Sequence, residues 1–325
     1  MYTMKKRVAI VCGGFSGESV VSMRSAQMIT DNIDRDLYDP VKVVITENEW
    51  YAESTQGNIA VNRSDFSVEL NGENHTFDGV FMIIHGTPGE NGILQGYFEL
   101  LGLPTTTGDT LNMALTFNKK MTTRVLETFG FHVAQSITLK RSETIVTHKI
   151  VERLGLPCFV KPNCGGSSIG TSRVNAESEL AHAIEKAMLV DDQIIIEQFI
   201  EGTEVTCGVI QWQGKIMALP ITEIVSQTEF FDYEAKYNGY SEEITPARLN
   251  ETIYKQVQAN SEAIYTSLDC RGMIRVDYII RGSDIFVIEV NTTPGFSEAS
   301  IIPQQAAVHG IDKKSLISAV ISSCF

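Results

Sequence analysis

The alternation of apolar and polar residues is clearest in residues 271–300, where it predicts two strands joined by a short polar turn. β-branched and aromatic residues are dense on both sides of that turn. Alternate side chains of a strand share a face, so Arg275 and Asp277 are expected to point the same way. Glu289 and Asn291 are expected to do so on the partner strand. The pattern therefore predicts a polar patch on an otherwise apolar hairpin.

Two interpretations of this patch are open. Cross-strand ion pairs are the simpler one. However, burying carboxylates beside core-type residues costs on the order of several kcal/mol unless an ion or a charged ligand compensates. Asp277, Glu289 and Asn291 offer hard oxygen donors without Cys or His, which favours Mg²⁺ carrying a nucleotide phosphate over zinc. Gly295, in the turn that follows, lets a backbone N–H approach a ligand closely.

The first hundred residues alternate between strand and helix patterns. The predicted strands are 7–12, 41–46 and 79–84, and the predicted helices are 22–32 and 93–101. This order predicts a small open α/β sheet whose ligands lie beyond the carboxyl ends of its strands. The third strand delivers His85 to that edge, as a loop-structural or a ligand-binding residue. A domain boundary is expected near Pro104.

The middle of the chain contains a second candidate site. One helix is predicted at 110–129, with Lys119 and Lys120 in its interior, and another around 146–154. A buried strand then ends in Lys161 and is followed by a glycine- and serine-rich run at 163–170. Successive N–H groups of such a loop suit a phosphate, although the lysine precedes the loop, unlike a Walker P-loop. A flexible hairpin turn is the structural alternative.

Two further segments carry weaker signals. After a predicted strand at 193–197, apolar residues next to spaced carboxylates fit an adenine slot and a ribose contact, or an ordinary strand connection. Residues 230–248 form a polar, aromatic stretch that is too long for a simple connector and is typical of a lid. A terminal helix is predicted at 311–323.

Composition narrows the class of protein. The chain has 325 residues, with 40 acidic and 26 basic side chains spread along its length, which argues against a nucleic-acid partner. No apolar run approaches the roughly 20 residues that span a bilayer, and the N-terminus does not have the pattern of a signal peptide. The six cysteines show no CxxC pairing, so reduced thiols and a cytoplasmic location are expected.

In their order, these segments resemble the ATP-grasp superfamily and, within it, the D-alanine:D-alanine ligases. The resemblance covers essentially the whole chain. It rests on GG-x-S-x-E at 13–18, HGTPGENGILQG at 85–96, GLPCFVKPNCGGSS at 155–168, FFDYEAKY at 230–237, IRVDY at 274–278 and EVNTTPG at 289–295. It implies an α/β ATP-grasp fold with an N-terminal open parallel α/β domain (1–104), a central ATP-grasp subdomain (105–192) and a C-terminal subdomain with the hairpin (193–325).

The resemblance also implies an activity. ATP would convert one D-alanine to D-alanyl phosphate, and a second D-alanine would give D-alanyl-D-alanine, ADP and phosphate for peptidoglycan synthesis. Two Mg²⁺ ions, with Mn²⁺ as an alternative, would assist. The family implies a cytoplasmic homodimer without nucleic-acid or membrane partners.

Residue roles carried over from the family motifs fall into four groups. Those for catalysis are Glu18, Ser167, Tyr237, Arg275 and Gly295, with Ser167 and Tyr237 as hydrogen-bond partners of Glu18. For the amino acids, Glu18 would hold the ammonium of the first D-alanine, His85 would lie near its carboxylate, and Ser300 would bind the carboxylate of the second. Those for ATP are Lys119, Lys161, Glu197, Phe199, Ile200, Glu204 and Lys236. Those for metal are Asp277, Glu289 and Asn291.

The chain departs from the family pattern at Val20, at Asn91 and near Glu298, and Lys120 is an alternative to Lys119 by a one-residue shift. Three rival functions remain at this stage. A D-alanine:D-lactate or D-alanine:D-serine ligase shares the scaffold. A non-catalytic relative would be expected to lose metal ligands or phosphate lysines. A nicotinamide oxidoreductase would need the dinucleotide fingerprint, which the glycine-rich opening lacks.

Overall fold

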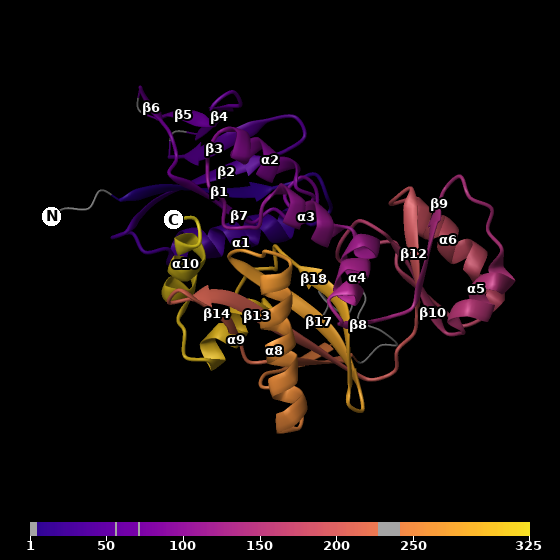
Figure 1. The fold of residues 1–325 in the computed structure, drawn as a ribbon. Coiled ribbons are helices and arrows are strands. Elements are labelled where there is room, and N and C mark those ends of the chain that lie inside the picture. The colour runs from indigo at the N-terminus through magenta and orange to yellow at the C-terminus, as the bar shows by residue number, and fades with distance from the viewer. Residues whose placement is uncertain (1–4, 56, 71, 227–240) are drawn as a thin grey trace.

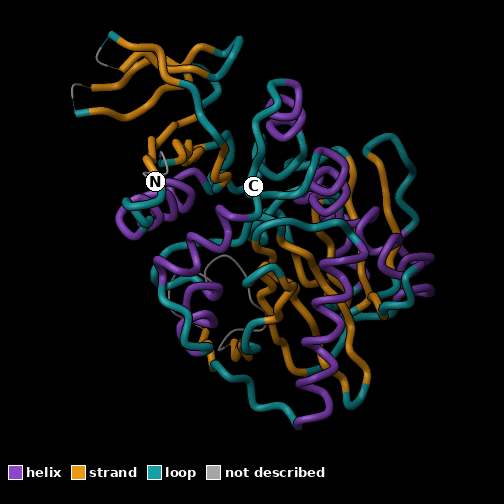
Figure 2. Tube along the Cα trace, turned by 60° about the vertical axis from the view of Figure 1, so that its left-hand side comes forward, coloured by secondary structure: helices purple, strands orange, loops and turns teal. Residues whose placement is uncertain are grey.

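The structure, a computed structural model, describes residues 5–55, 57–70, 72–226 and 241–325. It confirms the mixed α/β class, with three sheets whose strands come mostly from successive parts of the chain (Figure 1). Figure 2, in which strands are orange, shows that the strands gather in separate groups with helices against them. The predicted residues Lys236 and Tyr237 lie outside the described residues.

The first sheet has the strand order β6-β5-β4-β3-β2-β1-β7. Its strands are β1 (Lys6–Gly13), β2 (Tyr38–Ile45), β3 (Trp50–Ser54), β4 (Gly57–Asn62), β5 (Ser67–Leu70), β6 (Glu73–His75) and β7 (Gly79–Met82). β1 pairs in parallel with β2 and β7, as expected, whereas β3 to β6 add antiparallel hairpins. These hairpins were missed because strands such as β4 are short and largely exposed, so they lack a clear apolar alternation.

Helices α1 (Ser19–Asn32) and α2 (Ile93–Leu100) cover opposite faces of this sheet. β1 explains why: Ile10 packs in the same core as Ile29 of α1, and its neighbour Val11 packs in the same core as Phe98 of α2. Successive residues of a strand reach opposite faces, so an unbroken apolar strand requires a cover on each side. This arrangement leaves the carboxyl ends of β1 and β7 open to a ligand.

The second sheet has the order β11-β10-β12-β9, all antiparallel. It consists of β9 (Ser136–Lys140), β10 (Cys158–Pro162), β11 (Ser172–Val174) and β12 (Gln193–Gln198). The short 3₁₀ helix Glu177–Glu179 and helices α5 (Thr147–Leu154) and α6 (Leu180–Met188) accompany it, and the two α-helices share one core with the sheet. Because β12 pairs within this sheet, residues 193–198 group with the central segment.

The third sheet has the order β16-β15-β13-β17-β18-β8, with β14 beside β13. Its strands are β8 (His132–Val133), β13 (Thr203–Trp212), β14 (Lys215–Ala218), β15 (Thr222–Ser226), β16 (Ser241–Ile244), β17 (Met273–Arg281) and β18 (Asp284–Asn291). Helix α8 (Glu251–Ser267) covers one face, where Val276 and Tyr278 share a core with Val257. The predicted hairpin is therefore confirmed, and the side chains between these apolar residues face the opposite side.

The first and third sheets share a core. Helices α9 (Ile301–Val308) and α10 (Lys313–Ser322) follow the hairpin, and α10 lies beside α1 (Figure 1). Leu316 and Ile317 of α10 pack in one cluster with Ile29 of α1 and with Leu219, which follows β14. The end of the chain thus joins the N-terminal sheet to the hairpin sheet, and it sets their edges beside each other.

The single helix predicted at 110–129 was wrong. The structure has two helices, α3 (Thr110–Phe117) and α4 (Lys119–Thr128), separated at Asn118. Asn118 has an extended backbone, and its side chain accepts a hydrogen bond from the Met121 N–H, which caps α4. Lys119 consequently begins a helix and does not lie in the interior of one.

Candidate active site

The hairpin brings its four predicted polar residues to one face. Arg275 lies directly across from Asn291, and Asp277 lies across from Glu289. All four line a cavity of about 340 Å³, called the main cavity below. The two carboxylates and the amide therefore form one set of oxygen donors, as the strand alternation predicted.

Asp277 accepts hydrogen bonds from three side chains among the described residues. Arg275 donates to both carboxylate oxygens, from Nε at 2.8 Å and from Nη2 at 2.9 Å. Asn291 Nδ2 donates to Oδ2 at 3.1 Å, and Thr206 Oγ1 donates to Oδ1 at 2.6 Å. Burial lowers the pKa of Arg275, but the charge and hydrogen bonds of Asp277 outweigh this, and the net pKa is raised. Arg275 thus acts as the counterion of Asp277.

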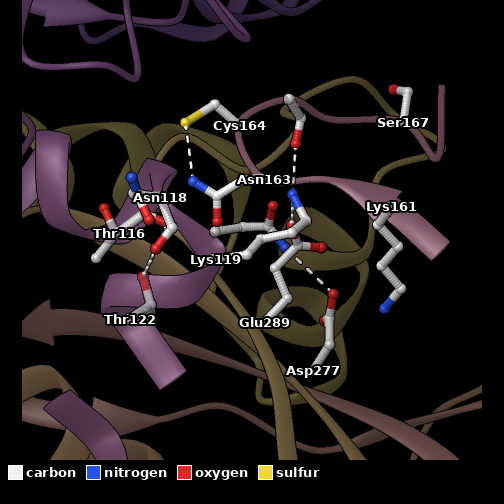
Figure 3. Close-up of polar contacts among 12 residues, drawn as sticks. Thr116, Asn118, Lys119, Thr122, Lys161, Asn163, Cys164, Ser167, Asp277 and Glu289 are labelled. Atoms are coloured by element: carbon white, nitrogen blue, oxygen red, sulfur yellow. Dashed lines mark hydrogen bonds and ion pairs between the residues drawn. The ribbon is translucent and has the colours of Figure 1, made fainter. Parts of the chain in front are cut away.

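Two lysines lie beside the hairpin, one from α4 and one from β10 (Figure 3). Lys119 Nζ donates to the Gly165 carbonyl at 2.6 Å and lies 3.2 Å from Glu289 Oε1. Lys161 Nζ is 2.7 Å from Glu197 Oε2. Burial lowers the pKa of Lys161, but the charge and hydrogen bond of Glu197, together with the charges of Glu289 and Glu204, raise it more, so the net pKa is raised. Both lysines line a small pocket of about 60 Å³, called the lysine pocket. Lys120 does not line this pocket.

The Gly/Ser loop, residues 163–171, forms the other wall of the lysine pocket. Asn163 fixes the start of this loop, since its Oδ1 accepts from the Lys120 N–H at 2.9 Å. Ser167 and Ser168 have left-handed backbones, with φ of 51° and 57°. Ser167 Oγ donates to Glu18, which is 149 residues away in the sequence. Position 166 has room only for glycine, because a Cβ there would lie 2.9 Å from Glu18 Oε2.

The N-terminal sheet contributes Glu18 and His85 to the main cavity. His85 Nδ1 donates to the Thr293 carbonyl at 2.8 Å, because a carbonyl oxygen only accepts. Its Nε2 is buried and has no partner among the described residues. Burial lowers the pKa of His85. The neutral ring therefore offers an Nε2 lone pair to a donor in the cavity.

The turn after the hairpin closes the cavity from the C-terminal side. Gly295 and Ser300 line it, and a Cβ on Gly295 would lie 2.9 Å from Ser300 Oγ. Ser300 Oγ accepts from the Ser297 N–H at 2.9 Å. Ser300 also precedes α9, so it sits where a helix begins.

The predicted ATP-binding residues are not all in one hollow. Glu204 lines the main cavity, whereas Ile200 lines a separate depression beside Phe286. Phe199 packs near Phe159, with ring centroids 6.1 Å apart, and the Arg173 guanidinium lies 4.9 Å from its centroid. The lysines and the hairpin are thus brought together, while Phe199 and Ile200 lie to one side of them.

Several cavity residues were missed from the sequence, namely Arg24, Glu90, Thr206 and Glu243. Glu90 Oε2 accepts from the Gly86 N–H at 2.6 Å. Burial, and to a smaller extent the charge of Glu18, raises the pKa of Glu90 to about 8. Glu90 belongs to the polar run that follows the predicted strand 79–84, so its position could have indicated a site residue. Thr206 gave no signal, because a threonine in a strand is ordinary.

A glycine- and serine-rich loop and a lysine pair lie beside a carboxylate-bearing hairpin that belongs to a different sheet from the loop. This arrangement defines an ATP-grasp protein. Comparison with known proteins is more specific. Residues 7–108 match the family model for the D-ala D-ala ligase N-terminus, and residues 125–322 match that for the C-terminus. The chain belongs to the D-alanine–D-alanine ligase family.

Individual relatives agree with this assignment. The chain is 46% identical to a D-alanine–D-alanine ligase of Phocaeicola vulgatus, over 99% of this chain and 100% of that one. It is similar in structure to the VanG D-Ala:D-Ser ligase of Enterococcus faecalis, with a TM-score of 0.88, 32% identity and coverage of 99% and 100%. A D-alanine–D-alanine ligase of Bacillus anthracis complexed with ATP gives a TM-score of 0.80 at 27% identity, covering 98% and 97%.

Proposed function

We propose that this protein is an ATP-dependent ligase that joins two D-alanines to D-alanyl-D-alanine for peptidoglycan synthesis, with release of ADP and phosphate. The observation that carries the proposal is the convergence of Glu18, Ser167 and the hairpin residues on one cavity. These groups come from three separate sheets or loops, so the cavity exists only in the assembled fold. The family membership supplies the substrate class.

ATP binding is assigned to the lysine pocket and the adjoining Gly/Ser loop. Lys119 and Lys161 supply positive charge, and backbone N–H groups of the loop suit phosphate oxygens. Both lysines now pair with Glu289 and Glu197 respectively, so phosphate binding would exchange these partners. Glu197, Phe199, Ile200 and Glu204 are proposed for the adenine and ribose, and Lys236 for the terminal phosphate.

The donor set of Asp277, Glu289 and Asn291 fits Mg²⁺, because its oxygens are hard and lie on one face. Across the described residues, no group of three or more His, Cys, Asp or Glu side chains could hold a metal ion. Substrate phosphate oxygens would therefore complete the shell, as is usual for magnesium–nucleotide sites. When bound, two Mg²⁺ ions, or Mn²⁺, neutralise charge on the phosphoryl group that is transferred.

The first amino acid is assigned to Glu18 and His85. Glu18 is held by Ser167 and suits an ammonium group, and the neutral His85 Nε2 suits a further N–H donor of that group. The family resemblance instead implies that His85 lies near the carboxylate. Because Nδ1 already donates to Thr293, a bond to the carboxylate would need a second proton, on Nε2. Burial lowers the pKa of His85, which favours the neutral ring and a contact with the ammonium. The carboxylate then points toward the lysine pocket.

The reaction has two steps. A carboxylate is a poor acyl donor, so its oxygen first attacks the γ-phosphorus of ATP, which gives D-alanyl phosphate and ADP. The amine of the second D-alanine, whose carboxylate is assigned to Ser300, then attacks the acyl carbon. Arg275 and the Gly295 N–H stabilise the oxyanion before phosphate leaves. Arg275 binds Asp277 through Nε and Nη2, which leaves the Nη1 N–H groups for the oxyanion. Tyr237 is proposed to help exclude water, since acyl phosphates hydrolyse readily.

The domain limits of 1–104, 105–192 and 193–325 are kept as a proposal. The pairing of β12 with β10 favours moving the second limit to just after Gln198. A cytoplasmic location is proposed because ATP is a cytoplasmic substrate. Among the described helices, none is long and apolar enough to cross a membrane.

A homodimer is also proposed. Helices α2 and α3 adjoin each other and expose Ile93, Leu100 and Leu111, with 61%, 89% and 74% of each residue accessible. Exposed apolar residues on two neighbouring helices favour a second copy as the occupant. The double variant Leu100→Asp/Leu111→Asp should sediment as a monomer, whereas Leu189→Asp, at an exposed leucine of the central segment, should not change the mass. A dimer that survives the double variant contradicts this interface.

A D-alanine:D-serine ligase is the second candidate, because VanG gives a high TM-score with this chain. The test is phosphate release from ATP and Mg²⁺ with D-alanine alone, D-alanine plus D-serine and D-alanine plus D-lactate, with mass detection of products. The proposal predicts D-alanyl-D-alanine as the main product in all three mixtures. A main product containing serine or lactate would favour the second candidate, and absence of phosphate release would contradict both.

A further inference from the structure

Among the described residues, three side chains donate to Asp277, and two of them have other tasks in the proposed function. Arg275 is assigned to the oxyanion, and Asn291 is assigned to the metal. Each can keep its bond to Asp277, because Asn291 donates from Nδ2 and Arg275 from Nε and Nη2, but each is shared with a ligand. The third donor is Thr206, whose Oγ1 lies 2.6 Å from Asp277 Oδ1. Within the described part of the chain, Thr206 is the donor to Asp277 that has no other assigned task.

The position of Thr206 makes the contact a rigid one. Thr206 lies on β13 and is paired in register with Asp277 on β17. The residue is only 2% exposed. Its backbone carbonyl accepts from Gln305 Nε2 at 3.0 Å, and the Gln305 Oε1 accepts from the Gly208 N–H at 2.9 Å. A buried glutamine from α9 therefore braces the strand on which Thr206 lies.

The hydroxyl also has a clear preference between acceptors. A threonine hydroxyl carries one proton, and the alternative acceptor, the Val276 carbonyl, lies 3.4 Å from Oγ1. The shorter contact and the negative charge of Asp277 favour the carboxylate. Residues that orient a metal ligand in this way commonly tune metal affinity.

We propose that Thr206 is a positioning residue for the metal ligand Asp277: its buried hydroxyl orients the carboxylate independently of the contacts that Arg275 and Asn291 make with their own ligands. The inference rests on the proposed function, since it assumes a metal ion at Asp277. It assigns Thr206 no contact with the substrate. The expected consequence is a change in metal affinity without loss of the fold.

The test compares Thr206→Val, which replaces the hydroxyl with a methyl group, with Thr206→Ser, which keeps the hydroxyl. The matched control is Thr222→Val, because Thr222 is an equally buried threonine of the same sheet whose hydroxyl contacts Gln305 and Thr245. Mn²⁺ is titrated into each protein with ADP present, and free Mn²⁺ is followed by its paramagnetic resonance signal. Melting temperatures are measured on the same samples.

We expect Thr206→Val to weaken Mn²⁺ binding about tenfold or more, Thr206→Ser to stay near wild type, and Thr222→Val to leave the affinity unchanged. If Thr206→Val does not fold, Thr206→Ala with Thr222→Ala gives the same comparison. Wild-type affinity in Thr206→Val, or equal weakening in Thr222→Val, overturns the inference and makes Thr206 merely structural. Failure of the wild-type protein to bind Mn²⁺ overturns the proposed metal site itself, and this inference with it.

Discussion

The hairpin β17–β18 and the Gly/Ser loop both present polar groups to adjoining pockets, but different contacts hold them in place. In the hairpin, the ladder of backbone hydrogen bonds sets Asp277 opposite Glu289. In the loop, side chains from elsewhere set the backbone: Asp191 accepts from the Cys164 N–H at 2.7 Å, and Glu18 accepts from Ser167. A side-chain change should therefore alter charge in the hairpin and shape in the loop.

The largest effect is expected for Asp277→Asn. It keeps the size of the side chain but removes the charge that faces Arg275. The hairpin should therefore still fold, while the proposed metal-assisted phosphoryl transfer is lost. We expect a fall in kcat of about 1,000-fold, measured as phosphate release with D-alanine, and an unchanged circular dichroism spectrum. Asp284→Asn is the control, since Asp284 is an exposed carboxylate at the turn of the same hairpin. A loss of less than tenfold in Asp277→Asn would contradict the assigned role.

A smaller effect of a different kind is expected for Gly166→Ala. The new Cβ would approach Glu18 Oε1 to 3.1 Å and Oε2 to 2.9 Å, so Glu18 and Ser167 must separate. We expect the KM for D-alanine to rise about tenfold with a smaller change in kcat, because ground-state binding is what is disturbed. Gly17→Ala, where an added Cβ meets no atom within 4 Å, should have nearly wild-type kinetics. Equal effects of the two variants would show that contact with Glu18 is not the cause.

The smallest effect concerns Glu90, whose side chain holds the turn at Gly86 much as Glu18 holds the Gly/Ser loop. Its pKa is raised from 4.5 to about 8 in the folded protein, so the folded state binds the proton more tightly. The stability that this provides is complete below pH about 4.5 and is lost as the pH rises through about 8. Glu90→Gln should therefore gain melting temperature relative to wild type between pH 5 and 8, by a few degrees.

The measurement is a melting temperature at each pH for wild type, Glu90→Gln and Glu69→Gln, an exposed carboxylate on β5. The difference between Glu90→Gln and wild type should widen with pH, while that for Glu69→Gln should stay flat. A constant offset for Glu90→Gln would mean that ionisation of Glu90 does not affect stability.

The same contrast explains what the sequence could predict. The hairpin and its polar face follow from local alternation, since Val276 and Tyr278 had to enter a core. The break at Asn118 depends on a single capping residue within a continuous helical pattern, so it was missed. The contact between Ser167 and Glu18 spans most of two domains, and only the family resemblance indicated it. Thr206 became visible only with the strand register. The individual catalytic roles remain predictions.

The central claim is that an acyl phosphate forms in the main cavity, and ¹⁸O transfer tests it most directly. The enzyme is supplied with ATP, Mg²⁺ and D-alanine labelled with ¹⁸O in the carboxylate, and the released phosphate is examined by mass. A carboxylate oxygen that attacks phosphorus leaves with the phosphate when the amine displaces it. The account therefore predicts one ¹⁸O atom in each phosphate released with dipeptide. Dipeptide formation with unlabelled phosphate would contradict it.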